Sequence, residues 1–302
     1  MYKKYTVWIV SIVIAVAGAF WVAKLFSSNS IFKSSDKPKV ATTIYPLYDI
    51  TRTLAGDLID VGLIVDTGSS PHTFSISSKK LKELSQADAV FSFGHGVDNY
   101  IIDEIVQALG LHSVVVDSGS TLISDGEEGE DPHYWLSLNN SAAIARAVSD
   151  NLIALYPQYQ VEIESNLAIF IKNTEQLQKF YQNKFAEQDI KIATFHNAFA
   201  YLADSVGFEV VATFEEFPGE EPSAAWLKEF SDQIQKNSIT VLYAEPQFST
   251  SAIESLATDL GVKIDTLDPL GGSNEAYSYI TMIKYNLDKI LANSVVENSE
   301  EN

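Results

Sequence analysis

Between Gln160 and Glu187 the chain reads QVEIESNLAIFIKNTEQLQKFYQNKFAE. This segment contains no Gly or Pro, and its apolar residues recur at helical spacing, as Ile163, Leu167 and Phe170 illustrate. A single helix over the segment would be roughly 40 Å long at about 1.5 Å per residue. We expect it to form a rigid connection between two lobes, with an ordinary surface helix pair inside one lobe as the alternative.

On both sides of this segment, short apolar or β-branched runs alternate with helical patterns. The runs cover residues 39–44, 61–65, 89–93, 113–116, 191–195, 210–213, 240–244 and 263–267. Such alternation is typical of parallel sheets covered by helices. We therefore predict an α/β fold with two lobes, each a four-stranded, mostly parallel sheet flanked by helices, joined by one long helix.

This pattern divides the chain into successive regions. We predict an N-terminal α/β lobe at 37–157, a linking helix at 158–188 and a C-terminal α/β lobe at 189–293. Residues 294–302 carry three Glu and no strand or helix signal, and we expect them to be a disordered acidic tail. Residues 1–36 are of a different kind.

The N-terminal region has the composition of a membrane anchor or signal segment followed by a Ser-rich tether. Residues 5–23 carry no charge and come close to the about 20 apolar residues that span a bilayer. Small residues at 15–19 fit a signal-peptidase site, but the apolar run continues past them, which favours an uncleaved transmembrane helix. We expect the protein at the extracytoplasmic face of the cell membrane, anchored by this segment or exported after its cleavage.

Composition excludes some classes of protein. The chain has 40 acidic and 20 basic residues, a formal net charge of −20, which excludes a nucleic-acid partner because phosphate binding needs a basic face. It has no Cys, so neither a lipobox nor a disulfide is available. The acidic surplus favours solubility first, and attraction of divalent cations second.

Four polar residues stand just past apolar segments: His72, His133, His196 and Asp268. Ligands of open parallel sheets bind where the carboxyl ends of strands meet, and two of these residues come from each predicted lobe. Three imidazoles and one carboxylate suit a tetrahedral zinc site in the cleft between lobes. Their long separations match no compact metal motif, so spacing alone leaves a metal site and separate structural roles equally open.

The other two histidines lack such a setting. We expect His95 and His112 to be structural or exposed, although His95 also follows a strand and is the one that could line the cleft.

Six short motifs carry a family resemblance. They are Pro71-His72-Thr73-Phe74, Asp131-Pro132-His133-Tyr134-Trp135-Leu136, Phe195-His196-Asn197-Ala198-Phe199-Ala200-Tyr201, Gly219-Glu220-Glu221-Pro222-Ser223, Ala244-Glu245-Pro246-Gln247-Phe248 and Leu267-Asp268-Pro269-Leu270-Gly271. In this order, across residues of about 40 to 293, they resemble the motifs of the zinc/manganese solute-binding proteins of ABC importers.

The resemblance implies two α/β lobes joined by a single long helix, with one metal ion between them. It implies His72, His133, His196 and Asp268 as the metal ligands, and delivery to a membrane permease driven by a cytoplasmic ATPase. Manganese receptors of the family resemble one another in having Glu at the third position, so His196 favours zinc, with manganese as the alternative. Physical chemistry agrees, because imidazole donors suit zinc better than manganese.

Two further features concern the surroundings of the site. We interpret Glu245 as a partner for a histidine N–H group behind the ligands. Some zinc members have a long His-rich loop before the Asp-Pro-His motif, whereas residues 124–131 here are short, acidic and free of His. This loop gathers cations weakly through carboxylates or is merely solvated, and its role stays open.

A zinc-dependent hydrolase is the rival from another class. It would need an open metal position and a base such as Glu245 or Glu220, but no His-Glu-x-x-His or nucleophile-elbow motif occurs. A metal-binding surface adhesin would coexist with metal capture. We predict a monomeric, non-enzymatic, high-affinity receptor without catalytic residues, for which zinc is the transported ligand.

Overall fold

The computed structural model describes residues 30–33, 36–124, 129–215, 221–273 and 275–294. The predicted membrane segment, residues 125–128 of the acidic loop and residues 295–302 of the acidic tail therefore lie outside the described residues. Among the described helices, none combines the length and the apolar character that crossing a membrane requires.

The N-terminal half is built on a four-stranded parallel sheet in the order β2-β1-β3-β4. Its strands are β1 (Lys39–Thr42), β2 (Asp60–Leu63), β3 (Ala89–Ser92) and β4 (His112–Val115). Its helices are α2 (Tyr45–Ala55), α3 (Ser78–Leu84), α4 (Asn99–Leu109) and α5 (Ser141–Leu155). The central strands β1 and β3 are almost wholly buried, as expected for strands covered by helices on both faces.

The C-terminal half repeats the plan with the order β6-β5-β7-β8. Its strands are β5 (Lys191–Thr194), β6 (Glu209–Thr213), β7 (Val241–Ala244) and β8 (Lys263–Thr266). Its helices are α7 (Ala200–Val206), α8 (Ala224–Lys236), α9 (Ser251–Leu260) and α10 (Tyr279–Ser294). The prediction of two four-stranded parallel sheets flanked by helices is thus confirmed.

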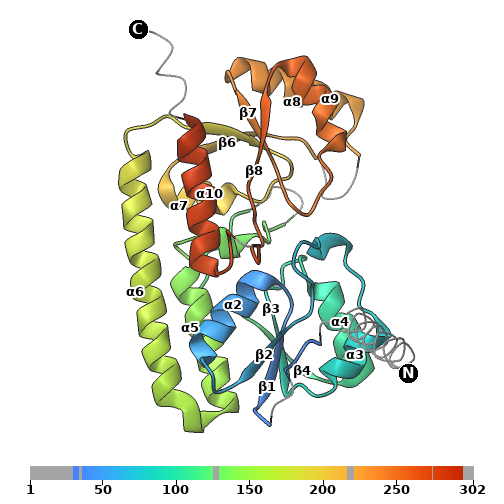
Figure 1. Cartoon of the computed structure of the whole chain (residues 1–302), viewed down its shortest axis with the longest axis vertical. Helices are drawn as coiled ribbons and strands as arrows, with labels where there is room; N and C mark the ends of the chain where they lie inside the picture. The colour runs from blue at the N-terminus through green and yellow to red at the C-terminus, as the bar shows by residue number, and fades with distance from the viewer. Residues whose placement is uncertain (1–29, 34–35, 125–128, 216–220, 274, 295–302) are drawn as a thin grey trace, which may run out of the picture.

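Helix α6 (Gln160–Phe185) is 26 residues long and runs beside both halves (Figure 1). It contacts α2 and α5 of the N-terminal half and α7 and α10 of the C-terminal half. One side of the helix is packed, with Ile163, Phe170 and Tyr181 buried, while Val161 and Ile169 on the other side are more than half exposed. The predicted long connecting helix is therefore present, and only its inner face is packed.

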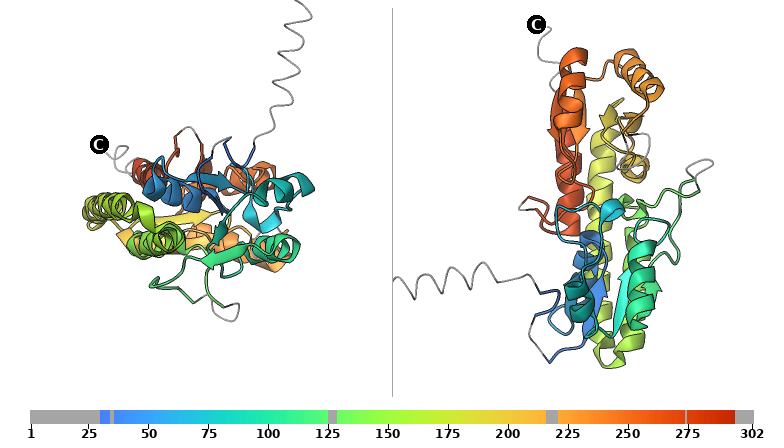
Figure 2. Two further views of the ribbon diagram at one scale, coloured as in Figure 1. Left: turned by 90° about the horizontal axis from the view of Figure 1, so that it is seen from below. Right: turned by 90° about the vertical axis from the view of Figure 1, so that its right-hand side faces the viewer.

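The halves are joined at a second place, where the chain returns from β8 to the N-terminal half. Trp135 Nε1 donates a hydrogen bond of 2.9 Å to the Pro269 carbonyl, and the Tyr279 hydroxyl donates to the Trp135 carbonyl at 2.8 Å. The Tyr279 N–H donates to Asp49 Oδ2 of helix α2 at 2.7 Å. Helix α10 then runs beside α6 (Figures 1 and 2).

The hydrophobic core reflects this double connection. One large cluster of buried side chains extends from the N-terminal sheet across α5 and α6 to α7 and α10. A smaller second cluster lies between the C-terminal sheet and helices α8 and α9, and includes Phe195, Phe214 and Phe230. Because the larger cluster is shared, the halves are held together by packed apolar side chains as well as by covalent links.

Two neighbouring residues of α6 test how much stability its inner face contributes. Phe170 is 3% exposed and its ring lies 5.7 Å from that of Tyr279, whereas Ile169 is 56% exposed. We expect Phe170→Ala to lower the free energy of unfolding by about 3–5 kcal/mol, because it leaves a cavity at the joint between the halves. Ile169→Ala should change it by no more than about 0.5 kcal/mol. Urea denaturation followed by circular dichroism measures both, and equal effects would contradict the one-sided packing.

Candidate metal centre

His72 lies on a single 3-10 turn, Pro71–Thr73, after strand β2. The Tyr100 hydroxyl of α4 donates a hydrogen bond to the Pro71 carbonyl. Lys80 of α3 pairs with Asp66 at 2.9 Å at the start of the same connection. These contacts hold the loop between β2 and His72, and Pro71 fixes the backbone just before His72.

His133 is oriented by the carboxylate two residues before it. Asp131 Oδ1 accepts hydrogen bonds from the His133 backbone N–H at 2.9 Å and from ring atom Nδ1 at 2.8 Å. The Tyr201 hydroxyl of α7 donates to the Asp131 carbonyl at 2.7 Å, so this loop is tied to the C-terminal half as well. His133 itself is 5% exposed.

His196 lies two residues past the end of strand β5 and is oriented by a residue that follows the neighbouring strand. Its Nδ1 lies 2.5 Å from Oε1 of Glu245, which directly follows β7. Because β5 and β7 are paired in parallel, the residues after their carboxyl ends come side by side. His196 is 4% exposed and Glu245 2% exposed.

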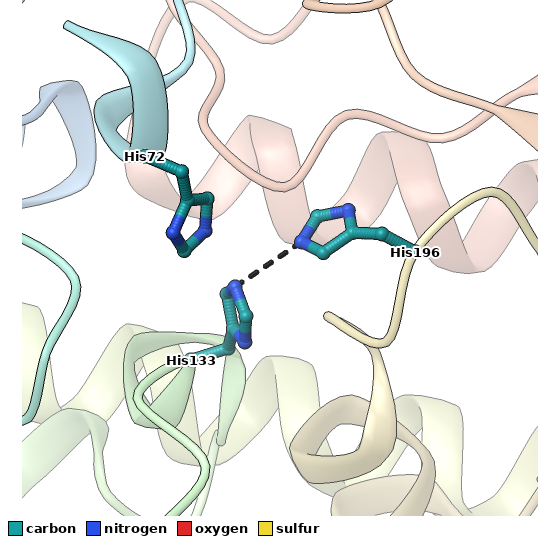
Figure 3. A group of neighbouring side chains, drawn as sticks. All are labelled: His72, His133 and His196. Atoms are coloured by element: carbon teal, nitrogen blue, oxygen red, sulfur yellow. Dashed lines mark hydrogen bonds between the residues drawn. The ribbon is translucent and has the colours of Figure 1, made fainter. Parts of the chain in front are cut away.

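The three imidazoles converge on one point from three separate loops (Figure 3). One nitrogen of each of His72, His133 and His196 lies within 4.8 Å of the others, and the Nε2 atoms of His133 and His196 are 3.2 Å apart. Nitrogens on a tetrahedral zinc ion, at about 2.0–2.1 Å each, are separated by about 3.3 Å. The spacing of this pair thus already suits a shared metal ion.

The hydrogen bonds to Asp131 and Glu245 decide what these nitrogens offer. Each carboxylate accepts the Nδ1 proton of its histidine, so each neutral ring keeps a lone pair on Nε2. Two lone pairs facing each other at 3.2 Å repel unless a proton or a metal ion lies between them. The arrangement therefore favours a cation at this point.

Protonation differs between the histidines. Burial, together with the neighbouring imidazoles of His133 and His196, lowers the pKa of His72 to about 3, so this ring is neutral at pH 7. Burial also opposes protonation of His196, but the carboxylates of Glu245, Glu215 and Asp131 together outweigh it, and the pKa of His196 is raised. With Nδ1 engaged by Glu245, the additional proton belongs on Nε2, where a metal ion would bind.

The surroundings of the histidines are small and negatively charged. Asp131 Oδ2 and Glu245 Oε2 are buried without a hydrogen-bond partner among the described residues. The cavity beside them has room for a sphere of water size only, about 10 Å³. Its walls are formed by Ser70, Pro71, His72, His133, Trp135, His196, Glu245, Gln247, Phe248, Pro269 and Leu270. Such a site accommodates a single ion, and the buried carboxylates supply negative charge that a divalent cation would balance.

Asp268, the fourth predicted ligand, follows β8 and is 2% exposed. It is not among the group of described side chains that lie within 4.8 Å of one another. Its Oδ1 atom accepts hydrogen bonds from the N–H groups of Leu270 and Gly271, at 3.1 and 2.8 Å, and from Gln247 Nε2 at 3.1 Å. The structure therefore brings the three predicted histidines together and holds the carboxylate to one side.

The remaining histidines lie elsewhere. The His95 ring lies between two carboxylates, with Nε2 3.0 Å from Asp117 and Nδ1 2.8 Å from Glu130. His112 is exposed on the edge strand β4. The acidic partners of His95 are 22 and 35 positions away in the sequence, which is why no local pattern indicated them.

Two polar residues of the site were not singled out from the sequence. Asp131 stands in the Asp-Pro-His motif, and its position two residues before His133 was the available signal. Gln247 stands in the Glu-Pro-Gln-Phe motif beside Glu245. The possible base Glu220 lies outside the described residues.

Comparison with solved structures shows the same fold. A crystal structure of ZnuA superimposes with a TM-score of 0.78 at 27% identity, covering 86% of this chain and all of that one. Zinc-bound AdcA from Streptococcus pneumoniae superimposes with a TM-score of 0.72 at 29% identity, covering 85% of this chain and 58% of that one.

Curated relatives agree. The zinc-binding lipoprotein AdcA of Streptococcus pneumoniae (strain ATCC BAA-255 / R6) is 29% identical over 277 residues, which is 84% of this chain and 55% of the relative. The chain thus spans about half the length of that protein. The high-affinity zinc uptake system protein ZnuA of Bacillus subtilis (strain 168) is 26% identical over 307 residues, covering 91% of this chain and 96% of the relative.

A family model decides the assignment, because it matches most of the chain and includes both sheets and the three converging histidines. The match runs over residues 40–293. The chain belongs to the ZnuA family, described as the zinc-uptake complex component A, periplasmic.

Proposed function

We propose that this protein is an extracytoplasmic receptor that captures one zinc ion between its two halves and delivers it to an ABC-type permease. The observation that carries the proposal is the convergence of His72, His133 and His196 on a cavity of ion size. The buried carboxylates behind two of these rings support it, because they hold the Nε2 lone pairs toward a common point.

Zinc fits this donor set better than the alternative, manganese. Three imidazole nitrogens are borderline donors that suit zinc, whereas manganese prefers sites with more carboxylate and water oxygens. The ZnuA and AdcA relatives are named for zinc uptake and zinc binding. Asp268 is the fourth ligand in this proposal, which requires a movement of its loop that brings the carboxylate to the ion.

A hydrolase is less well supported than a receptor. The cavity beside the histidines has space for about one water-sized particle, and an organic substrate needs far more. Glu245, the described candidate for a general base, is engaged by Nδ1 of His196. The family description of an uptake component also points to transport.

The wider organisation is part of the proposal. Residues 1–36 would anchor or export the protein, 37–157 and 189–293 would form the lobes, 158–188 the linking helix and 294–302 an acidic tail. The partner would be the membrane permease with its cytoplasmic ATPase, approached by a monomeric receptor. Shared core packing across α6 and α10 supports a receptor whose halves move little when metal binds.

Metal content tests the ligand assignment. The wild-type protein should bind one zinc ion. His72→Ala, His133→Ala or His196→Ala should each weaken zinc binding by more than about 100-fold, because the loss of a metal ligand lowers affinity more than the loss of a residue that hydrogen-bonds to a ligand. Asp268→Ala should do the same if it is the fourth ligand. Native mass spectrometry and competition with a fluorescent chelator measure stoichiometry and Kd.

His112→Ala is the matched control, because it removes an exposed histidine at the start of β4 that does not line the cavity. It should leave zinc binding unchanged. Full zinc occupancy in a variant lacking all three site histidines would refute the proposed site, and hydrolytic turnover that follows zinc content would revive the hydrolase.

Zinc affinity should fall as the pH is lowered. The proton favoured by the raised pKa of His196 occupies the nitrogen that zinc needs, so proton and metal compete. The loss should set in as the pH falls through this raised pKa, above the ordinary histidine value, and reach about tenfold per pH unit for each proton displaced. His72, with a pKa of about 3, should not contribute to it.

Glu245→Gln should move this loss to lower pH, because it removes the carboxylate that raises the pKa of His196. Zinc titrations between pH 5 and 8, with folding followed by circular dichroism, measure the effect. An affinity that is independent of pH over this range would contradict competition at His196.

A further inference from the structure

Two of the three site histidines have a hydrogen-bond acceptor for a ring N–H group, and the third has none among the described residues. His133 and His196 each have a buried carboxylate on Nδ1, from Asp131 and Glu245. Within the part of the chain that the structure describes, no residue forms a hydrogen bond with the His72 ring. A metal-bound imidazole keeps one N–H group, and in metalloproteins that group is normally paired with an acceptor. His72 therefore lacks the acceptor that the other two rings have.

The side-chain amide of Gln247 carries an acceptor oxygen of the kind that the His72 ring lacks. It lies in the turn after β7 and lines the same cavity as the three histidines. Its Oε1 atom is buried and has no hydrogen-bond partner among the described residues, which is rare for a buried amide oxygen. Its Nε2 atom donates to Asp268 Oδ1 at 3.1 Å. If the amide were turned over, Oε1 of Gln247 would lie against Oδ1 of Asp268, and two acceptors would be in contact. The contact with Asp268 therefore fixes which amide atom is Nε2 and which is Oε1.

We propose that Gln247 is the positioning residue of both His72 and Asp268 in the metal-bound protein. Its Nε2 holds the Asp268 carboxylate, and its Oε1 accepts the N–H of His72 when a metal ion draws that ring inward. This inference rests on the proposed function. An amide suits the role because it carries a donor for a carboxylate and an acceptor for an imidazole, whereas a carboxylate side chain would repel Asp268.

A contact between His72 and Gln247 would join the two halves of the chain. His72 belongs to the N-terminal half, while Gln247 and Asp268 belong to the C-terminal half. His72 is also less buried than His133 and His196, so it is the ligand nearest to solvent. A bond from His72 to Gln247 would close the site across the two halves and slow the escape of the metal.

The test compares Gln247→Leu with a matched control, Gln182→Leu. Gln182 is more exposed, but it also donates a side-chain hydrogen bond, of 3.0 Å to the Ser205 carbonyl, and it lies on α6 and does not line the cavity. Gln247→Leu should raise both the Kd for zinc and the zinc dissociation rate by about 10–100-fold, the usual cost of losing a group behind a ligand. Gln182→Leu should bind zinc like the wild type.

Two further measurements separate positioning from a general loss of structure. The Tm of the zinc-free Gln247→Leu protein should match that of Gln182→Leu. In zinc-loaded protein labelled with ¹⁵N, the ring N–H of His72 should exchange slowly with solvent in the wild type and in Gln182→Leu. In Gln247→Leu it should exchange rapidly.

Double-mutant cycles identify the partners. The effect of Gln247→Leu on the Kd should shrink in a His72→Ala background, and also in an Asp268→Ala background, because the interaction is already lost there. An undiminished effect in both backgrounds, or unchanged His72 exchange in Gln247→Leu, would overturn the inference. A wild-type protein that takes up no zinc would instead overturn the proposed function itself.

Discussion

The contact between the imidazoles of His133 and His196 is the constraint on which the site depends. Their Nε2 atoms lie 3.2 Å apart, and each ring is turned toward the other by a buried carboxylate on its far side. Such a pair is stable only with a cation between the lone pairs, whether that cation is a proton or a metal ion. Since the rings come from different halves of the chain, the halves must be held at a fixed separation.

Two crossings hold that separation. Helix α6 packs against helices of both halves, and the segment that leads from β8 into α10 is hydrogen-bonded to Trp135 and Asp49. The larger hydrophobic cluster continues through both crossings. A displacement of one half against the other would therefore disturb packed side chains, which do not deform continuously. In the proposed receptor, metal exchange would therefore use local movements of side chains and loops around His72 and Asp268.

Electrostatics complement this geometry. Asp131, Glu245 and Asp268 are each about 2% exposed, and the first two keep one oxygen without a described partner. Buried carboxylates are costly unless compensated, so the folded chain carries an electrostatic cost that a divalent cation relieves. In the proposed receptor, selectivity would then follow from the imidazole donors and the small size of the site, and affinity would gain from the negative charge behind the histidines.

The sequence by itself determined the two sheets and the long helix, because strand and helix periodicity are local properties of the chain, and its short motifs indicated the three histidines that the loops bring together. The sequence did not determine which carboxylate accepts a hydrogen bond from which histidine ring. Glu245 reaches His196 only because β5 and β7 are neighbours, and strand order depends on how distant segments pack. Tertiary structure likewise decided that Asp268 lies apart from the three histidines and that Oε1 of Gln247 is buried without a described partner. Both depend on how residues far apart in the sequence pack together.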